Sequence, residues 1–500
     1  MKILLITGLF AAPMVKEAVN NISDKEFKID VKVLNYPIAS LMTTKYIAEN
    51  LKGISKNDYD YIIIPGLSIG DASVIESVTG IPTYKGTEDA YNIPVLLKAL
   101  KEGIKLSKTE PADKLLRISR EEEINSILSN LEKEGEYAFE INGVKIPMIP
   151  PPFRVFLEVD VNNYNIDDVE EIKKNVDVVV VGFPAGHDDL DDLRRHMRKF
   201  IDLGLPVGID SASNRELIEG VNLGASFVFN LNELNIDKLE GIRKQAAFIV
   251  APFTTENKLE VTTNLIKKAK EKGYEKIIGD VILSPPLVGL TQSIMDYYIL
   301  KKNFPEVPML MGFLNVTELI DADSVGINAI LTSIAAELGV SCILTMERDK
   351  TRNSTYEIKK ASQMISLALK MRRFPKDLGI DLLILKDKKY YDGEVRPEGE
   401  VIEVKDQVSM ERDKAGYAVI FKEKDKVGVV WRGKRKLTIV GKDGLSVGRR
   451  LIKEVCEISP QHALYIGYEL SKAEIASALR KTYIQDKPLF KRIANEDSNS

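Results

Sequence analysis

The fold of this chain is decided by residues 153–183, FRVFLEVDVNNYNIDDVEEIKKNVDVVVVGF, in which two short apolar runs flank a polar stretch. Short runs rich in branched residues predict buried strands, and strands that alternate with helices predict a parallel sheet. Further apolar runs continue this pattern at 205–210, 225–230, 246–253, 276–283, 307–315 and 340–346. Eight strand–helix units in about 195 residues favour a closed (β/α)8 barrel, a TIM barrel, over a doubly wound open sheet.

The segment before the barrel predicts a separate α/β domain over residues 1–145. Its apolar runs KILLITG, FKIDVKVLNYP and DYIIIPGL are short and bounded by turn residues, and probable helical stretches such as 41–52 lie between them. We interpret residues 2–7 as a first strand rather than as part of a signal peptide. A cluster of prolines at 147–152 marks the boundary, so the barrel is expected over 150–370.

The segment after the barrel predicts a third, α+β domain over residues 375–490. Alternating runs at 379–391, 417–431 and 435–441 indicate an antiparallel or mixed sheet, and two helices are expected over 444–457 and 472–481. The polar residues 491–500 are expected to form a disordered tail. His462 lies far in sequence from any second histidine or cysteine, so we interpret it as a packing or capping residue.

Composition excludes several classes of protein. Hydrophobic residues make up 44% of the chain and charged residues 29%, as in folded proteins, and the net charge of −4 gives no footprint for nucleic acid or an anionic membrane. Two cysteines and three histidines are too few for a disulfide framework, an iron–sulfur cluster or a zinc ribbon, so no metal is predicted. No apolar run is long enough to span a bilayer, and a cytoplasmic location is expected.

Two polar loops of the N-terminal domain follow predicted strands, at residues 68–71 and 85–89. Parallel sheets bind ligands at the carboxyl ends of their strands, which makes these loops candidates for a binding site. Simple connecting turns explain them equally well.

Polar side chains also stand where the barrel strands end, and the carboxyl end of a barrel is where TIM-barrel chemistry is found. The expected strand ends carry Asp210, Asn230, Asp280 and Asn315, with Glu158 and Asp160 on the first strand and Arg348 after the last. Short acceptors and amides without histidine or cysteine suit a flat heterocycle with amide and amino groups, because a carboxylate accepts two parallel hydrogen bonds.

These residues carry a resemblance to a known family. Residues 208–211, Gly-Ile-Asp-Ser, followed by Gly224-Ala225 and Phe229-Asn230, resemble the pterin-binding barrel of dihydropteroate synthases, in which a strand ending in Asp precedes one ending in Asn by about twenty residues. The stretch 311–317, with Ile327-Asn328 in the next helix, is similar to the related methyltransferases that use a methylated tetrahydropterin. The resemblance covers residues 150–370, and the three-domain layout resembles archaeal proteins related to dihydropteroate synthase.

The resemblance implies a reduced pterin, of the folate or methanopterin type, as ligand. It assigns pterin contacts to Asp210, Asn230 and Asp280, with Asn315 added from the methyltransferase branch, and gives Asp280 the pyrimidine edge. A structural alternative for Asp280 is a buried carboxylate paired with a lysine.

Three functions stay open. The first is condensation of a pterin methyl diphosphate with an arylamine, as in folate biosynthesis, where Arg348, supported by Lys350 or Arg352, would bind the diphosphate. Pairing of Arg348 with Glu347 or Asp349 is its structural alternative. The second is methyl transfer to cobalt or a thiol, which would bring in a corrinoid protein as partner. The third is pterin binding without catalysis.

The overall layout favours condensation, which is therefore the function we expect, whereas Asn315 favours methyl transfer. Three elements of dihydropteroate synthases are missing here: the Ser-x-Lys of strand 7, the histidine of the last strand and the Asn-Val-Thr-Pro-Asp loop. A homodimer is a further open expectation.

Overall fold

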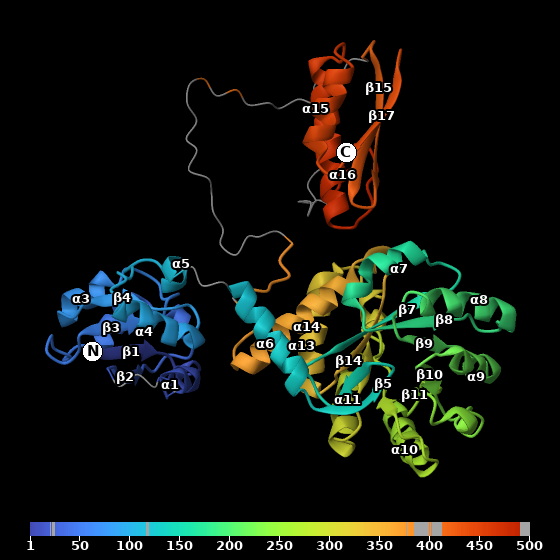
Figure 1. Ribbon diagram of the computed structural model, residues 1–500, viewed down its shortest axis with the longest axis horizontal. Coiled ribbons are helices and arrows are strands. Elements are labelled where there is room, and N and C mark those ends of the chain that lie inside the picture. The colour runs from blue at the N-terminus through green and yellow to red at the C-terminus, as the bar shows by residue number, and fades with distance from the viewer. Residues whose placement is uncertain are drawn as a thin grey trace.

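The computed structural model describes residues 1–20, 22, 26–116, 120–376, 378–384, 400, 402 and 413–490. It consists of a small parallel sheet with helices, a large barrel and an antiparallel sheet with two helices (Figure 1). None of the helices in the described part of the chain combines the length and apolar character that crossing a membrane requires.

The barrel contains all eight predicted strands, in a parallel sheet ordered β12-β11-β10-β9-β8-β7-β14-β13. A parallel bridge between Gly279 and Met309 brings the two edges together, so the predicted barrel is confirmed. The strands are β7 (Arg154–Asp160), β8 (Val178–Gly182), β9 (Val207–Asp210), β10 (Phe227–Leu231), β11 (Ala247–Val250), β12 (Ile277–Gly279), β13 (Leu310–Gly312) and β14 (Cys342–Met346).

Helices surround the barrel because each presents an apolar stripe to the strands. They are α7 (Ile166–Ile172), α8 (Leu190–Ile201), α9 (Asn214–Leu223), α10 (Lys258–Glu271), α11 (Leu290–Asn303), the short α12 (Leu314–Thr317), α13 (Ser324–Leu338) and α14 (Ser354–Met371). A single 3-10 turn, Glu240–Ile242, stands between β10 and β11 in place of a full helix.

Inside the barrel, the rings of Phe156, Phe227 and Phe229 are packed together and fully or almost fully buried. A hairpin that the sequence did not predict, β5 (Tyr137–Ile141) and β6 (Val144–Pro147), contributes Ile146 to the same core. The side chain of Asn142, at the hairpin turn, donates a hydrogen bond of 2.6 Å to Ser226 at the start of β10. The hairpin therefore covers the end of the barrel where the strands begin.

The N-terminal unit is a four-stranded parallel sheet ordered β2-β1-β3-β4. Its strands are β1 (Lys2–Thr7), β2 (Lys28–Val33), β3 (Tyr61–Ile64) and β4 (Thr83–Lys85), and its helices are α1 (Ala12–Asn20), α2 (Thr44–Asn50), α3 (Ser73–Thr79), α4 (Ile93–Lys101) and α5 (Ala112–Leu116). The first strand and the helix after it lie where the sequence predicts them. Helix α6 (Arg120–Glu134) leads from this unit to the hairpin and packs against α14.

The C-terminal unit is an antiparallel sheet of β15 (Gly416–Glu423), β16 (Lys426–Gly433) and β17 (Lys436–Gly441), packed on α15 (Gly444–Glu454) and α16 (Pro460–Ala478). Helix α16 begins twelve residues earlier than predicted, because Ser459 caps its amino end and Pro460 suits the first helical position. His462 lies in this helix, buried beside Trp431, with Nδ1 3.0 Å from Asp413.

Two predictions about this region involve residues that the structure does not describe. Residues 379–384 form no strand, and residues 385–391 of the same predicted strand lie outside the described residues. The predicted tail at 491–500 also lies outside them, and the predicted domain boundaries stay predictions.

Candidate functional site

The strand ends of β7, β8 and β9 lie at one level of the barrel mouth. Asp160 is in register with Gly182, Gly182 with Asp210, and Asp210 with Phe229, the residue before Asn230. This register is a direct consequence of the parallel sheet. It brings Asp210 and Asn230 to neighbouring positions on adjacent strands.

Three half-buried polar side chains at this mouth have no hydrogen-bond partner among the described residues. They are Glu158 on β7, Asp210 on β9 and Asn230 on β10, whose backbone carbonyl alone accepts a bond, from Asn235. Each of these side chains keeps access to solvent, so water or a polar ligand at the mouth can form its hydrogen bonds.

The carboxyl groups at this mouth are held away from water and close to one another. Burial raises the pKa of Glu158 to about 8, with further contributions from the charges of Asp210, Glu318 and Asp160. Burial likewise raises the pKa of Asp210 to about 6. At neutral pH Glu158 is therefore mostly protonated and has a hydrogen to donate, whereas Asp210 is mostly ionised.

Asp280 is buried and directly follows β12. Its Oδ1 accepts hydrogen bonds from the Tyr297 hydroxyl and, at 2.7 Å, from the backbone of Ile282. Burial raises its pKa to about 6, although these bonds and the charge of Lys258 act in the opposite direction. No ion pair with Lys258 forms among the described residues. Oδ2 has no hydrogen bond within the same residues, so one oxygen of Asp280 is oriented by the protein and the other is open.

Asn315 differs from its predicted position at the end of a strand. Strand β13 ends at Gly312, and Asn315 lies in the short helix α12, where its Nδ2 donates a hydrogen bond of 2.9 Å to the carbonyl of Leu283. Asp280 thus belongs to the segment after β12, and Asn315 is hydrogen-bonded to the same segment. Asn328, in the motif taken from the methyltransferases, is enclosed between α13 and α14 and donates to Glu357 at 2.8 Å.

The candidate phosphate ligands lie at the rim of the barrel and have protein partners. Arg348 is half-exposed, and its Nε lies 3.4 Å from Asp349. Lys350 donates to the carbonyl of Ile320 and lies 3.4 Å from Asp321. The structure therefore places Arg348 in the pairing that the sequence offered as the alternative to phosphate binding.

The four predicted pterin contacts form two pairs: Asp210 with Asn230 on β9 and β10, and Asp280 with Asn315 around the segment after β12. Within the described residues, no hydrogen bond joins any two of these four side chains. Their roles in binding stay predictions. No group of three or more metal-ligating side chains occurs in the described part of the chain either.

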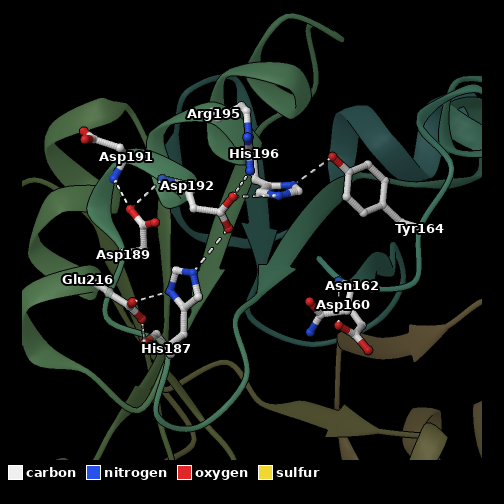
Figure 2. A network of polar contacts seen from close by, with 11 residues as sticks. Asp160, Asn162, Tyr164, His187, Asp189, Asp191, Asp192, Arg195, His196 and Glu216 are labelled. Atoms are coloured by element: carbon white, nitrogen blue, oxygen red, sulfur yellow. Dashed lines mark hydrogen bonds and ion pairs between the residues drawn. The ribbon is translucent and has the colours of Figure 1, made fainter.

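A polar network beside this mouth connects two histidines through one carboxylate (Figure 2). Nδ1 of His187 lies 2.5 Å from Glu216, and Nε2 lies 3.3 Å from Asp192. The other oxygen of Asp192 lies 3.5 Å from Nε2 of His196, whose Nδ1 is 3.0 Å from the Tyr164 hydroxyl. The residues come from the β8–α8 loop, helices α8 and α9, and the loop after β7.

This network reaches the predicted pterin site through Glu216. The hydroxyl of Ser211, the residue after Asp210, donates to Glu216. The backbone of Asp191 and Asp192 donates to the Asp189 side chain, which caps helix α8 and fixes the position of Asp192.

The pKa values of the two histidines are expected to shift in opposite directions. Burial alone would lower the pKa of His187, but Glu216 and Asp192 raise it above the usual value, whereas burial lowers the pKa of His196. Histidine NMR should therefore show more than half of His187 and less than half of His196 protonated at pH 6.5. Protonated His187 stabilises the fold fully below pH 6.5, and this contribution is lost as pH rises through its raised pKa.

The control for this experiment is Asp192→Asn, which removes a charge shared by both rings. It should lower the pKa of both His187 and His196, because the Asp192 charge raises both. Coincident titrations in the unmodified protein would contradict the network.

Comparison with known proteins identifies the family. The chain is 32% identical over 535 residues to the uncharacterized protein MJ0107 of Methanocaldococcus jannaschii, covering 98% of this chain and 99% of that protein. The chain belongs to the family of MJ0107. Residues 1–88 match a family of unknown function, DUF6513, and residues 402–486 match the family PterinBD-DUF4346.

Solved structures show a likeness to the barrel. Dihydropteroate synthase from Thermus thermophilus has 13% identity and a TM-score of 0.35, covering 44% of this chain and 96% of that one. The Yersinia pestis enzyme has 15% identity and a TM-score of 0.36, covering 47% and 99%.

Several residues of this site were not predicted from the sequence of this member of the MJ0107 family. Tyr297 and Lys258 act on Asp280 from helices α11 and α10, at positions with no local motif. The i,i+4 spacing of Asp192 and His196 places both on one face of a helix and could have indicated their pairing. Nothing in the sequence indicates the link from His187 to Glu216, which spans 29 residues.

Proposed function

We propose that the barrel mouth binds a reduced pterin and that this chain is a pterin-dependent transferase. The observation that carries the proposal is the set of half-buried side chains without protein partners among the described residues, Glu158, Asp210 and Asn230, near the ends of strands β7, β9 and β10. The resemblance of these strands to pterin-binding barrels supports it. So does the match of residues 402–486 to a family named for a pterin-binding domain.

The chemistry of a pterin fits these groups. Its pyrimidine edge presents an amino group and a ring N–H in parallel, which a carboxylate accepts, and its carbonyl and ring nitrogens accept from an amide or a protonated carboxyl. The open oxygen of Asp280, the Asn230 amide and the protonated Glu158 supply these acceptors and donors. The bond from Tyr297 fixes the Asp280 carboxyl before a ligand arrives.

Of the two transfer reactions, the charges favour methyl transfer. A diphosphate leaving group requires cations, but Arg348 and Lys350 are engaged with Asp349 and Asp321 at the rim. The mouth itself gathers the carboxyl groups of Asp160, Asp210 and Glu318 around the protonated Glu158. A diphosphate next to the pterin ring would be repelled there, whereas a methylated tetrahydropterin has no diphosphate at that position.

A protonated carboxyl can also assist methyl transfer as a proton donor. The bond between N5 and the methyl carbon breaks readily only when N5 gains a proton. The methyl group then passes either to cobalt(I), which becomes methylcobalt(III), or to a thiolate, which becomes a thioether. Glu158 is protonated at neutral pH and can supply this proton or hydrogen bond. Whether the acceptor is a corrinoid protein or a small thiol is decided by experiment.

The test uses two assays on the full chain. The first contains a methyl-tetrahydropterin with cob(I)alamin, kept reduced by a chemical reductant, or with a thiol, and the second contains a pterin methyl diphosphate with an arylamine. We expect product in the first only, retained in Arg348→Ala. Product in the second only, lost in Arg348→Ala, would replace methyl transfer by condensation. Binding of pterins without product in either assay would leave a binding protein.

Replacing Asp280 by Asn is expected to weaken pterin binding by about 2–3 kcal/mol, because a hydrogen bond to a charged group is lost. Asparagine retains the shape and can still accept from Tyr297, so the fold should tolerate it. Isothermal titration with a tetrahydropterin measures the effect. Asp296→Asn, on the same stretch of α11 as Tyr297 but paired with Gln292, is the control and should bind normally. Equal affinity in Asp280→Asn would remove Asp280 from the site.

A further inference from the structure

The N-terminal sheet carries a second cavity, remote from the barrel mouth. It has a volume of about 890 Å³ and is lined by the loops after β1, β3 and β4 together with α13, α14 and residues 372–376. This volume lies within the range of about 300–1,000 Å³ typical of ligand pockets. The cavity thus lies between the N-terminal unit and the outer helices of the barrel.

The cavity occupies the position where parallel sheets bind ligands. In the order β2-β1-β3-β4, strand β2 lies on one side of β1 and strand β3 lies on the other. Loops at the carboxyl ends of β1 and β3 therefore diverge and leave a crevice, and mononucleotides occupy this crevice in sheets of the same order. Residues 86–88, within one of the two polar loops that the sequence singled out, line the cavity; the other loop does not.

A buried hydroxyl in the cavity wall has no partner. Thr7 is the last residue of β1, is 1% exposed, and its Oγ1 forms no hydrogen bond within the described residues. Thr7 is among the residues that line the cavity. An unsatisfied buried hydroxyl is unfavourable, and a polar atom of a ligand would satisfy it.

The walls are apolar and include aromatic rings that are unusually exposed. Phe10 and Phe374 are 59% and 60% exposed, and their rings meet edge to face at 6.1 Å. Leu9, Leu41 and Leu369 are exposed in the same wall. A flat ring system would cover this apolar surface.

One arginine in the cavity wall forms no ion pair with any described residue. Arg373 is bound to Asp89 at 2.7 Å, which fixes the segment after α14 to the N-terminal unit. The adjacent Arg372 lines the cavity, is exposed, and has no ion pair within the described residues. The lining also contains Glu88, Glu337 and Lys376, and Arg372 is the guanidinium in it that has no ion pair within the described residues, so it can bind an anionic group.

We propose that this cavity binds an anionic aromatic molecule of mononucleotide size, with a polar ring edge at Thr7, the ring against Phe10 and Phe374, and the anionic group at Arg372. This site is separate from the pterin site and does not depend on it. Adenine and flavin mononucleotides share the required chemistry and differ in the size of the ring.

The test titrates the full chain with flavin mononucleotide and AMP, and with riboflavin and adenosine as their uncharged counterparts. We expect at least one nucleotide to bind, and its uncharged counterpart to bind about tenfold more weakly, because the charge-assisted bond to Arg372 is absent. Arg372→Gln should weaken the nucleotide by a similar factor and leave its counterpart unchanged. Thr7→Val, which keeps the shape of the side chain, should weaken both about fivefold.

The control is Arg449→Gln, an exposed arginine on α15 that should leave binding unchanged. Failure of all four molecules to bind at millimolar concentration would overturn the proposal. Binding that a tetrahydropterin displaces would also overturn it, because the ligand would then occupy the barrel mouth. Because Arg372 is exposed, its variant should fold even where Thr7→Val does not.

Discussion

Glu158→Gln is expected to slow methyl transfer by about 10²–10⁴-fold, the usual contribution of a general acid. Glutamine has the same shape and still donates a hydrogen bond, so pterin binding should change little while the proton is no longer available. Single-turnover kinetics separate these two effects. Affinity that falls together with the rate would indicate that Glu158 only binds the pterin.

The pH dependence gives a second test of the same carboxyl. Its pKa of about 8 means that the acid form is present at neutral pH and is lost as pH rises through 8, so the rate should fall above that pH. Glu318→Gln is the matched control, because it removes a neighbouring charge that raises the Glu158 pKa. It should retain the rate at pH 7 and move the fall to lower pH. A rate independent of pH from 6 to 9 would contradict the assignment.

The sequence predicts the barrel because each strand is a local signal. Runs such as 176–183 are apolar, branched and bounded by turns, and their regular spacing leaves little choice of topology. The hairpin at 137–147 escapes prediction because its residues alternate only weakly and acquire a buried face only against the barrel interior. Helix α16 is longer than predicted for a related reason, since its first half packs on a sheet that the sequence alone does not place.

The candidate site is predictable only in part, for the same physical reason. Residues at strand ends follow from the strands, so the strand pattern alone places Asp210 and Asn230 at adjacent positions. It does not give the raised pKa of Glu158, because that pKa depends on burial and on carboxylates from two other segments as well as from β7 itself. The position of Asn315 in a helix also depends on where β13 stops pairing, which is a property of the closed sheet.

Phe156→Ala is expected to destabilise the barrel by about 3–5 kcal/mol, the usual cost of removing a fully buried aromatic ring. The ring lies 5.2 Å from that of Phe227 and 6.1 Å from that of Phe229, and the hairpin residue Ile146 belongs to the same core. Strands fixed in a closed barrel cannot collapse into the cavity, so most of the lost contact is not recovered. Urea denaturation followed by circular dichroism measures the change.

The only tryptophan of the chain makes this experiment internally controlled. Trp431 is buried in the C-terminal sheet, so its fluorescence reports that unit and not the barrel. In Phe156→Ala the circular dichroism transition should move to lower urea while the fluorescence transition stays in place. Phe156→Leu, which refills most of the volume, should recover more than half of the loss. A fluorescence transition that moves by the same amount would instead show that barrel and C-terminal sheet unfold as one cooperative unit, because a cavity in one part of a two-state structure lowers the stability that every probe reports.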